Sequence, residues 1–582
     1  MSFCDPCRGP RIRGSTVLLA AAVSAACHAP ARPTTAAPGT ALSGRYASAP
    51  HGMVVSASSI ASEAGRDVLA AGGNAVDAAI ATGFALAVTY PAAGNVGGGG
   101  FMIIRFPDGR ATAIDFRERA PSAATPDMFT DSTGAYSARI HHDSYKSVGV
   151  PGTVAGFALA HHRYGKTQWA RLVDPAVTLA RDGFPVPTGL AQSLESARAQ
   201  FSPYPASVTA YTRNGAAYTA GEQLRQPDLA QTLIRIRDNG QDGFYRGETA
   251  RLLAAEMRRG GGLITEADLA QYEAKERVQI RGTYRGYEII SMPPPSSGGV
   301  ALVEMLNILE GFDLRAARHN SAQYVHLVTE AMRRAFVDRA RYLGDPDFVQ
   351  PPVERLTSKA YAAKLRATID PVHASASAPA QVDERYESTQ TTHYSVVDAS
   401  GIAVSVTYTL ENTYGLGAVV TGAGFLLNNE MGDFNGKPGV TDTTGLIGTA
   451  ANVARPGKRM LSSMTPTIIT RGGKLVGVVG TPGGRTIINT VLQVILNQTD
   501  FDMGIQDAVA AHRFHHQWLP DVLFVEREGL APEAEAALES AGYRIRWTDE
   551  QGTAHSIRID SLTGARQGAA DPRDPDAGAA GY

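Results

Sequence analysis

The sequence predicts a layered protein of mixed helices and strands, of the α/β or α+β class. Three observations indicate this class. An apolar helix is expected from Asn74 to Val88, helical periodicity dominates from about residue 150 to 345, and strands dominate after Gln390. With 582 residues, 43% of them hydrophobic and 19% charged, the chain is long enough for one multi-layer domain or several lobes.

Charge and cysteine content narrow the classes of ligand. The net charge of −2 disfavours nucleic acid or an anionic membrane as the main partner, so the ligand is expected to be small and neutral or dipolar. Cys4, Cys7 and Cys27 are the only cysteines of the sequence. A Cys₄ metal site and a catalytic thiol are therefore excluded from the rest of the chain, which also suits an exported protein.

The first 48 residues resemble an export leader followed by a linker. Basic residues from Arg8 to Arg13 precede an apolar run at 17–23 that is too short to span a bilayer, and small residues follow up to Cys27. Residues 1–27 are therefore predicted to be a signal peptide. Two outcomes are open at its end: lipid attachment at Cys27, or ordinary cleavage nearby. The Ala/Pro/Thr-rich stretch 28–48 is predicted to be a flexible linker.

The first predicted elements of the body lie between residues 51 and 116. A short strand at 53–56 precedes a helix from Ser59 to Ala71 that ends at two glycines. Asn74 is expected to cap the next helix, which is apolar on nearly every face and therefore buried between layers. A glycine-rich run at 97–100 leads into a strand pair, Phe101–Phe106 and Thr112–Phe116.

Helices are expected next, and strands after them. The clearest helix runs from Ser321 to Leu343, with one apolar face, and ends at Gly344. Pro293–Pro295 is interpreted as a rigid turn that leads into a helix starting at Val300, and the polar stretch 371–388 as a loop or exposed segment. The sequence has no internal repeats.

A hairpin is predicted over residues 390–410, with its loop at Ala399–Gly401. Polar side chains share one face of each strand. Pairing these faces requires partners whose numbers sum to 800, which sets Thr391 opposite Thr409. Opposed Cβ atoms lie roughly 5 Å apart, so the two hydroxyls can hydrogen-bond. The alternative is a threonine-rich strand pair without a special role, because threonine favours sheets.

The sequence around this hairpin resembles a known processing site. Residues 390–398, Gln-Thr-Thr-His-Tyr-Ser-Val-Val-Asp, are similar to the site of bacterial γ-glutamyltransferases, members of the N-terminal-nucleophile hydrolase superfamily. The similarity extends from about residue 51 to Tyr582. It includes these further motifs: the glycine run 97–100, Asp115–Glu118, Pro151–Gly156, Met292–Gly299, Leu461–Met464 and Arg513–Trp518.

The resemblance implies a four-layer αββα sandwich that cuts its own chain between Gln390 and Thr391. Residues 49–390 would be the large subunit and 391–582 the small catalytic subunit of a heterodimer. The new α-amine of Thr391, with an ordinary pKa near 8, would accept the proton of its own hydroxyl. Thr409 would hold that hydroxyl, the role that the strand register independently allows.

The resemblance also assigns the remaining site residues. The amides of Gly483 and Gly484 would form the oxyanion hole, in a loop predicted between a strand at 475–479 and a helix at 487–496. An ordinary strand-to-helix turn is the alternative there. A γ-glutamyl group carries a carboxylate and an ammonium, so a cation is expected at one end of its pocket and acids at the other. The residues assigned to these ends are Arg117 with Ser462 and Ser463 for the carboxylate, and Asp433 with Glu411 and Glu430 for the ammonium.

Several positions depart from the pattern of the bacterial enzymes. A lid is expected from Lys437 to Arg459, with Thr444 where relatives often have an aromatic residue. Gly432, Met460 and Arg485 also replace common residues. Three pairs of adjacent histidines invite a metal hypothesis, but adjacent side chains on a strand point to opposite sides, and no His-Glu-x-x-His motif occurs. No metal or cofactor is therefore expected.

The predicted function is transfer of a γ-glutamyl group from glutathione and related compounds to water, or to the amine of an amino acid or peptide. The expected location is the periplasm or the medium. A glutaryl-type or cephalosporin acylase is the first alternative, although its substrates lack the α-amine that Asp433 would bind. A non-catalytic envelope binding protein is the second, against which Thr391, Thr409, Gly483 and Gly484 all argue.

Overall fold

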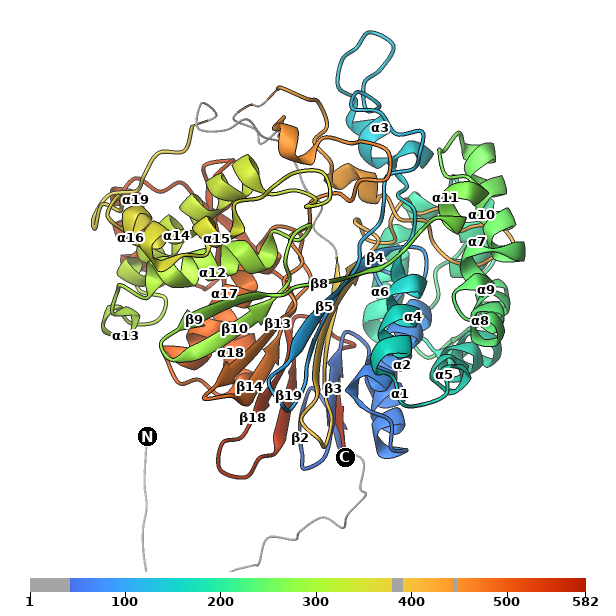
Figure 1. Ribbon diagram of the computed structural model, residues 1–582, viewed down its shortest axis with the longest axis horizontal. Coiled ribbons are helices and arrows are strands. Elements are labelled where there is room, and N and C mark those ends of the chain that lie inside the picture. Colours follow the sequence, from blue (N-terminus) through green and yellow to red (C-terminus); the bar gives the residue numbers. More distant parts are fainter. Residues whose placement is uncertain (1–41, 379–390, 441, 443–447) are drawn as a thin grey trace, which may run out of the picture. The chain divides into compact units, whose positions relative to one another are not determined.

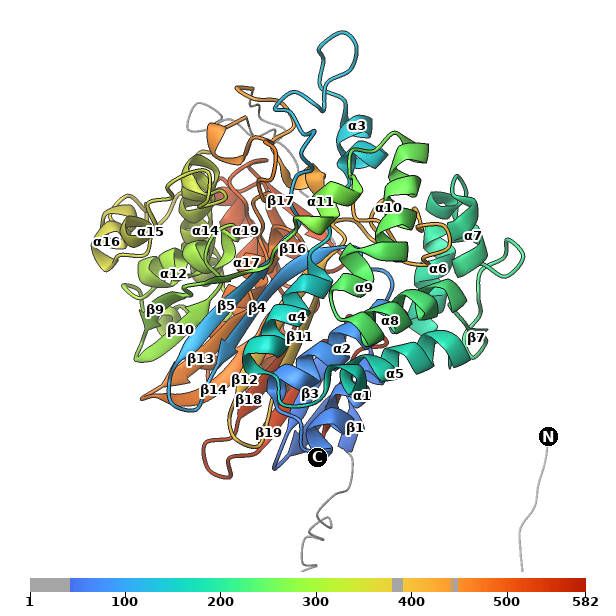
Figure 2. The ribbon, with the colours of Figure 1, turned by 45° about the vertical axis from the view of Figure 1, so that its right-hand side comes forward.

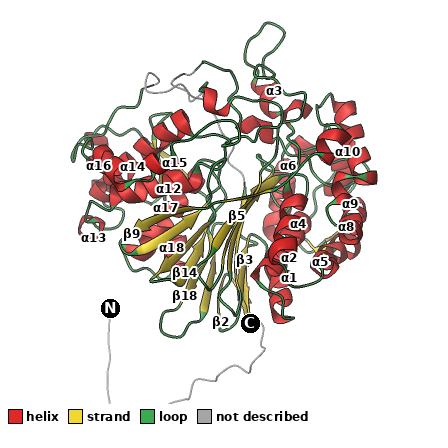
Figure 3. Cartoon of the chain, in the orientation of Figure 1, coloured by secondary structure: helices red, strands yellow, loops and turns green. Residues whose placement is uncertain are grey.

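The computed structural model describes residues 42–378, 391–440, 442 and 448–582. The predicted signal peptide with Cys27, the cleavage residue Gln390 and the lid residue Thr444 lie outside this part of the chain. Two antiparallel sheets lie face to face, and helices cover the outer face of each sheet (Figures 1 and 3). This layering confirms the predicted α+β class and its four-layer αββα form.

Eight strands of the described chain form the first sheet, and each is antiparallel to its neighbours. In spatial order they are β1 (Leu42–Gly44), β20 (Gly578–Gly581), β3 (Met53–Ser56), β11 (Thr392–Val397), β12 (Ala403–Thr409), β4 (Gly99–Arg105), β5 (Ala111–Phe116) and β8 (Lys275–Arg277).

Seven described strands form the second sheet, again all antiparallel. Their order is β2 (Tyr46–Ala49), β19 (Arg566–Ala570), β18 (His555–Ile559), β14 (Lys474–Val479), β13 (Thr467–Arg471), β10 (Tyr287–Ser291) and β9 (Ile280–Tyr284). Two small sheets lie apart from these layers, formed by β15 (Phe514–His515), β16 (Leu523–Glu526) and β17 (Ile545–Thr548), and by β6 (Phe184–Pro185) and β7 (Gln223–Leu224).

Helices form the two outer layers. On the side of the first sheet, at the right of Figure 1, lie α1 (Ser59–Ala70), α2 (Ala75–Thr89), α4 (Thr153–Tyr164), α5 (Trp169–Asp182), α6 (Thr188–Phe201), α7 (Pro205–Tyr211), α8 (Pro227–Asn239), α9 (Asp242–Tyr245), α10 (Gly247–Gly260) and α11 (Glu266–Ala270), with α3 (Ala138–His142) above them. On the side of the second sheet lie α12 (Gly298–Leu309), α13 (Leu314–Ala317), α14 (Ala322–Tyr342), α15 (Val353–Leu356), α16 (Lys359–Arg366), α17 (Thr486–Thr499), α18 (Ile505–Ala510) and α19 (Pro532–Ser540).

Strand β4 of the first sheet is apolar on both faces, as its central place requires. Along β4, Phe101 and Ile103 belong to the core that also holds the second sheet and α12. Met102 and Ile104 alternate with them and belong to the core shared with α1 and α2. Successive side chains of a strand point to opposite faces, so one strand serves two cores. All four of these side chains are fully buried.

Both sheets combine strands from the two sides of residue 390. In the first sheet, β11 and β12 lie between β3 and β4, and β20 lies between β1 and β3 (Figure 2). In the second, β13, β14, β18 and β19 lie between β2 and β10. A cut at residue 390 would therefore leave two chains that both contribute strands to both main sheets.

Most of the expected local elements are confirmed. Asn74 caps α2 through a reciprocal pair of hydrogen bonds with Asp77, and all of α2 is buried between α1, α5 and the first sheet. Ser321 caps α14, whose buried residues extend well beyond the predicted apolar face. Residues 293–297 form the turn before α12.

Two expectations about local structure are wrong. Residues 42–49, assigned to the linker 28–48 or to its border, form the edge strands β1 and β2, which pair with β20 and β19. His141, His142, His161 and His162 lie on α3 and α4, so the strand argument does not apply to them. The region 150–345 is mainly helical, as expected, and it also contains the short strands β6 to β10.

Candidate active site

A small cavity of about 20 Å³ brings together nine of the ten predicted site residues that the structure describes. Met464 and Ile487 complete the lining of this cavity. The selected residues that line it are Arg117, Thr391, Thr409, Glu411, Glu430, Asp433, Ser462, Ser463 and Gly484. They come from separate segments of the chain that the two facing sheets bring to one place.

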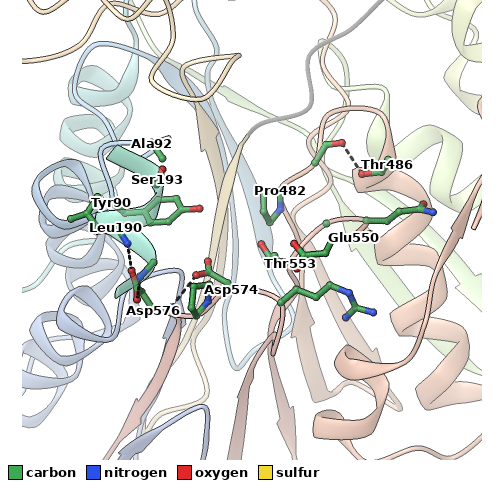
Figure 4. Close-up of a pocket in the computed structure, with 16 residues that line it drawn as sticks. Tyr90, Ala92, Leu190, Ser193, Pro482, Thr486, Glu550, Thr553, Asp574 and Asp576 are labelled. Carbon is green, nitrogen blue, oxygen red and sulfur yellow. Dashed lines mark hydrogen bonds between the residues drawn. The ribbon is translucent and has the colours of Figure 1, made fainter. Parts of the chain in front are cut away.

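Gly483 is the tenth selected residue and lines a different pocket, of about 350 Å³ (Figure 4). Its neighbours there include Pro482 of the same loop, Thr486 at the start of α17, and Thr553 and Asp574 from near the end of the chain. In the predicted oxyanion loop, Gly484 therefore lines the small cavity, whereas Gly483 lines the larger pocket.

The predicted hairpin has the expected register. Thr392 pairs with Tyr408, and His393 pairs with Thr407, so the numbers of each pair sum to 800. One further step along the strands sets Thr391 opposite Thr409. Both are nearly fully buried, at 4% and 2% exposure. Gly401 in the connecting loop has a φ of +88°, the left-handed conformation that the loop prediction requires.

The loop 480–484 joins β14 to α17, as predicted. Gly483 and Gly484 have φ angles of +131° and +58°, in which a side chain would be strained. The hydroxyl of Thr486 donates to the carbonyl of Gly483 at 2.7 Å, and the N–H of Ile487 donates to the carbonyl of Gly484 at 3.2 Å. The first turn of α17 therefore fixes the direction of both peptide groups.

Arg117 is buried at the end of β5 and forms ion pairs with Glu430 and Asp433. A third carboxylate, that of Glu118, lies 3.4 Å from its Nη1 atom. The sequence analysis expected the cation and the acids at opposite ends of the pocket, and in this structure they are in direct contact. A guanidinium removed from water needs an anion beside it, and the nearest anions are these acids.

Three carboxylates surround the single guanidinium of Arg117, and the pKa values of two of them are raised. Burial raises the pKa of Glu118 to about 7, although Arg117 acts to lower it. Burial also raises the pKa of Glu430 well above its ordinary value, with the charges of Glu118 and Glu411 adding to the effect. Burial alone would lower the pKa of Arg117, but the charges of Glu430 and Asp433 outweigh it, so this pKa is raised.

Ser462 and Ser463, which precede β13, have different hydrogen-bond donors. The Ser463 hydroxyl accepts a hydrogen bond from Nη2 of Arg339 at 3.1 Å, and Ser462 Oγ accepts one from the N–H of Met464 at 3.1 Å. Arg339 is buried on α14 and also donates to Ser297 Oγ at 2.9 Å. Sequence reasoning missed Arg339, because nothing in the pattern of a long buried helix singles out this arginine.

Glu411 has a neighbour that the sequence analysis also missed. Its Oε1 atom lies 3.2 Å from Nδ1 of His142, and its backbone has a φ of +77°, unusual for a residue with a side chain. A Cβ atom at Gly432 would lie 2.4 Å from Glu411 and 2.5 Å from His142. The glycine at position 432 thus leaves room for this contact.

The C-terminal end of the predicted lid, around Lys458 and Arg459, is held by hydrogen bonds and an ion pair. Lys458 donates to the carbonyls of Ala451 and Val453, and burial lowers its pKa to about 8. Arg459 lies 3.3 Å from Asp115, and Met460 is fully buried. Arg485 directly precedes α17 and is 4% exposed.

The part of the chain that the structure describes contains neither a metal-binding cluster nor a membrane-spanning helix. No group of three or more His, Cys, Asp or Glu side chains in this part of the chain is placed to hold a metal ion. None of the helices in it has both the length and the apolar character that crossing a membrane requires.

Comparison with known proteins places the sequence among well-described relatives. The family model described as Gamma-glutamyltranspeptidase matches residues 61–581. The Glutathione hydrolase proenzyme of Escherichia coli (strain K12) is 48% identical over 537 residues, which cover 92% of each chain. The structure of cephalosporin acylase from Bacillus halodurans is similar with a TM-score of 0.81 at 27% identity, over 96% of this chain and 99% of that one. Helicobacter pylori gamma-glutamyltranspeptidase matches 54% of this chain and 91% of its own, with a TM-score of 0.54 and 46% identity.

Proposed function

Because the chain belongs to the gamma-glutamyltranspeptidase family, we propose that it is an autoprocessing γ-glutamyltransferase that cleaves the γ-glutamyl amide of glutathione and related compounds. The observation that carries this proposal is the single cavity lined by both threonines, the arginine, the acids and the serine pair. A donor with one carboxylate, one ammonium and one amide matches the chemistry of that lining.

The proposed reaction has two steps. The Thr391 hydroxyl attacks the γ-carbonyl carbon, its proton passes to the α-amine of the same residue, and the amide nitrogen leaves with that proton. The γ-glutamyl ester on Thr391 then reacts with water or with the amine of an amino acid or peptide, which restores the threonine. Thr409 would hold the hydroxyl, and the N–H groups of Gly483 and Gly484 would stabilise the oxyanion of both steps.

Maturation would use the same hydroxyl. Thr391 Oγ would attack the carbonyl carbon of Gln390, and the C–N bond would break as the ester forms, which frees the α-amine of Thr391. Water would then hydrolyse this ester, which releases the carboxylate of Gln390 and restores the Thr391 hydroxyl. We place the large subunit before this bond and the small subunit at 391–582. The strand order supports this division, because both segments supply strands to both sheets. The two products of the cut would therefore stay entwined as a heterodimer.

Donor binding would use the charges around Arg117. The α-carboxylate would take up the arginine fork with help from Ser462 and Ser463, and the α-ammonium would lie against Asp433, Glu411 and Glu430. The ion pairs of Arg117 with Glu430 and Asp433 would then have to rearrange, because the donor carboxylate competes with these acids for one guanidinium. Donor affinity should therefore depend on the protonation of Glu430.

Replacing Glu430 by glutamine should lower the KM for the donor, and more so at high pH. Glu430 is neutral below its raised pKa and ionised above it, so its carboxylate competes with the donor carboxylate for Arg117 only at the higher pH. The loss of its contact with the ammonium should matter less, because Asp433 and Glu411 remain to bind that group. The KM of the wild type divided by that of Glu430→Gln should rise with pH to roughly tenfold. A tenfold ratio corresponds to ~1.4 kcal/mol of removed repulsion. Initial rates at a series of pH values measure it. A constant ratio across that series would contradict this role.

The family also contains acylases, and the solved cephalosporin acylase makes that activity the second candidate. A pair of anilides that differ only in the α-amine separates the two functions. We expect kcat/KM for γ-glutamyl-p-nitroanilide to exceed that for the glutaryl analogue by roughly 30- to 100-fold, because the amine fills a site of buried acids that would otherwise stay unpaired. Equal rates, or faster release from the glutaryl compound, would favour the acylase.

The leader supports a further part of the proposal, export to the periplasm or the medium. The basic, apolar and small-residue order of 1–27 is its only support, and lipid attachment at Cys27 is one of the two outcomes. The mass of the mature N-terminal chain distinguishes them, because a lipidated chain begins at Cys27 and carries added acyl mass. A chain that still begins at Met1 would contradict export.

A further inference from the structure

His393 lies two residues after Thr391, on the same face of β11, and the proposed reaction gives it no part. Its side chain is fully buried between the two sheets. Burial lowers the pKa of its imidazole well below the ordinary value, with the nearby His555 adding to the effect. The ring is therefore neutral at working pH and carries one N–H group.

The hydrogen bonds of the ring settle which nitrogen carries that proton. Nε2 lies 3.1 Å from Ser395 Oγ, and this hydroxyl donates its own proton to the carbonyl of His555 at 2.8 Å. Ser395 must therefore accept from Nε2–H. Nδ1 lies 2.8 Å from Thr407 Oγ1 and, having no proton in this tautomer, accepts from the Thr407 hydroxyl. Both nitrogens are engaged, so the ring is unavailable as a general base.

The third contact of the ring is with the loop of the second sheet. A Cβ atom at Gly480 would lie 2.1 Å from Cε1 and 2.3 Å from Nδ1 of His393, so only glycine fits against the imidazole there. Gly480 is the first residue of the loop that leads to Gly483 and Gly484. The carbonyl of Gly480 also accepts from the N–H of His555 at 3.2 Å. One ring thus touches β11, β12 and the start of the loop.

We propose that His393 is a positioning residue that fixes the distance between the Thr391 hydroxyl and the amides of Gly483 and Gly484. The inference rests on the proposed function, which assigns those two groups to one reaction. The nucleophile stands on the first sheet and the oxyanion loop on the second, so a rigid contact between the sheets is needed to hold both at a constant separation. The ring of His393 supplies such a contact, since it stands two residues from Thr391 and lies against Gly480.

The chain offers a matched pair of threonines for the test. Thr407→Val keeps the shape of the side chain and removes the hydroxyl that donates to His393. Thr392→Val makes the same change on the opposite face of the neighbouring strand, where the hydroxyl is buried with no hydrogen-bond partner among the described residues. His393→Leu removes both ring hydrogen bonds at similar volume, and Thr407→Ser restores the hydroxyl.

Each variant is assayed for maturation, kcat, KM and affinity for a γ-boronic acid analogue of glutamate, which mimics the tetrahedral intermediate. For Thr407→Val and His393→Leu we expect kcat and boronate affinity to fall together, on the order of 10- to 100-fold, with slower maturation and little change in KM or in inhibition by glutamate. Thr392→Val should behave as wild type, and Thr407→Ser should recover most of the loss.

Two results would overturn the inference while leaving the proposed function intact. One is wild-type kcat in Thr407→Val. The other is a loss that Thr407→Ser fails to restore and that follows the melting temperature, as in a merely structural role. If His393→Leu does not fold, the Thr407 variants decide the matter alone. Thr391→Ala, assayed in parallel, tests the proposed function separately, because only that variant removes the nucleophile.

Discussion

Thr391→Ala should remain a single uncut chain and lose γ-glutamyl transfer almost completely. The substitution removes the one atom that the proposal uses both to cut the bond after Gln390 and to carry the γ-glutamyl group. Without the cut, the α-amine that would accept the proton does not exist either. Removal of a nucleophile lowers kcat on the order of 10⁴- to 10⁶-fold in enzymes with a comparable constellation, and we expect a loss in this range.

Intact-mass analysis and release of nitroaniline from a γ-glutamyl anilide measure the two effects on one sample. The wild type should give two fragments that meet at 390/391, and Thr391→Ser should still mature, because it keeps a hydroxyl at the same position. Thr392→Val is the matched control for loss of a hydroxyl one residue away. Maturation of Thr391→Ala at the same bond would show that another residue is the nucleophile.

The site could be predicted from the sequence where local rules determine the geometry. The register of the hairpin follows from matching polar faces, because a slip of one residue would turn every side chain of β11 to the other face. The loop at 480–484 follows from glycines between a strand and an apolar helix. The cap of α2 follows from Asn74 and Asp77. In each case the residues that decide the structure lie within a few positions of one another.

The strands that the sequence analysis missed also carry local signals, but weak ones. β9 and β10 are short and meet at Arg285 and Gly286, both with positive φ, which is the geometry of a tight hairpin turn. An X-Gly pair between two β-branched or aromatic runs could have identified them. β1 and β2 carry less signal, since a stretch of small residues pairs at the sheet edges as readily as it forms a linker.

Contacts between distant segments could not be predicted in the same way. Arg117 meets Glu430 and Asp433 across 313 and 316 positions of the chain. A donor with a carboxylate at one end and an ammonium at the other suggested that Arg117 and the acids lie apart. Buried charges need partners of opposite sign, however, and this need brings Arg117 and the acids together. Only the packing of β5 against the loop after β12 decides between these two arrangements. The contact of His142 with Glu411 was missed for the same reason.

Arg117→Lys should fold and mature yet bind the donor poorly. The guanidinium presents a planar fork that reaches two carboxylates at once, as its ion pairs with Glu430 and Asp433 demonstrate. A lysine ammonium is a single point on a shorter reach, so it keeps the charge that the buried acids require but loses the paired hydrogen bonds to a carboxylate. Two charge-assisted hydrogen bonds at about 2 kcal/mol each correspond to a fall in kcat/KM of roughly 10³-fold.

The fall should lie mainly in KM, because the α-carboxylate is remote from the reacting carbonyl and binds equally in the ground and transition states. Arg117→Met is the contrasting variant: it leaves Glu118, Glu430 and Asp433 without a cation, so its melting temperature should drop, whereas that of Arg117→Lys should change little. Adding Glu430→Gln to Arg117→Met should recover part of that stability, since one buried charge is removed, without recovering donor binding. If Arg117→Lys instead keeps kcat/KM within threefold of wild type, the donor carboxylate binds elsewhere, and the ion pairs of Arg117 serve the fold alone.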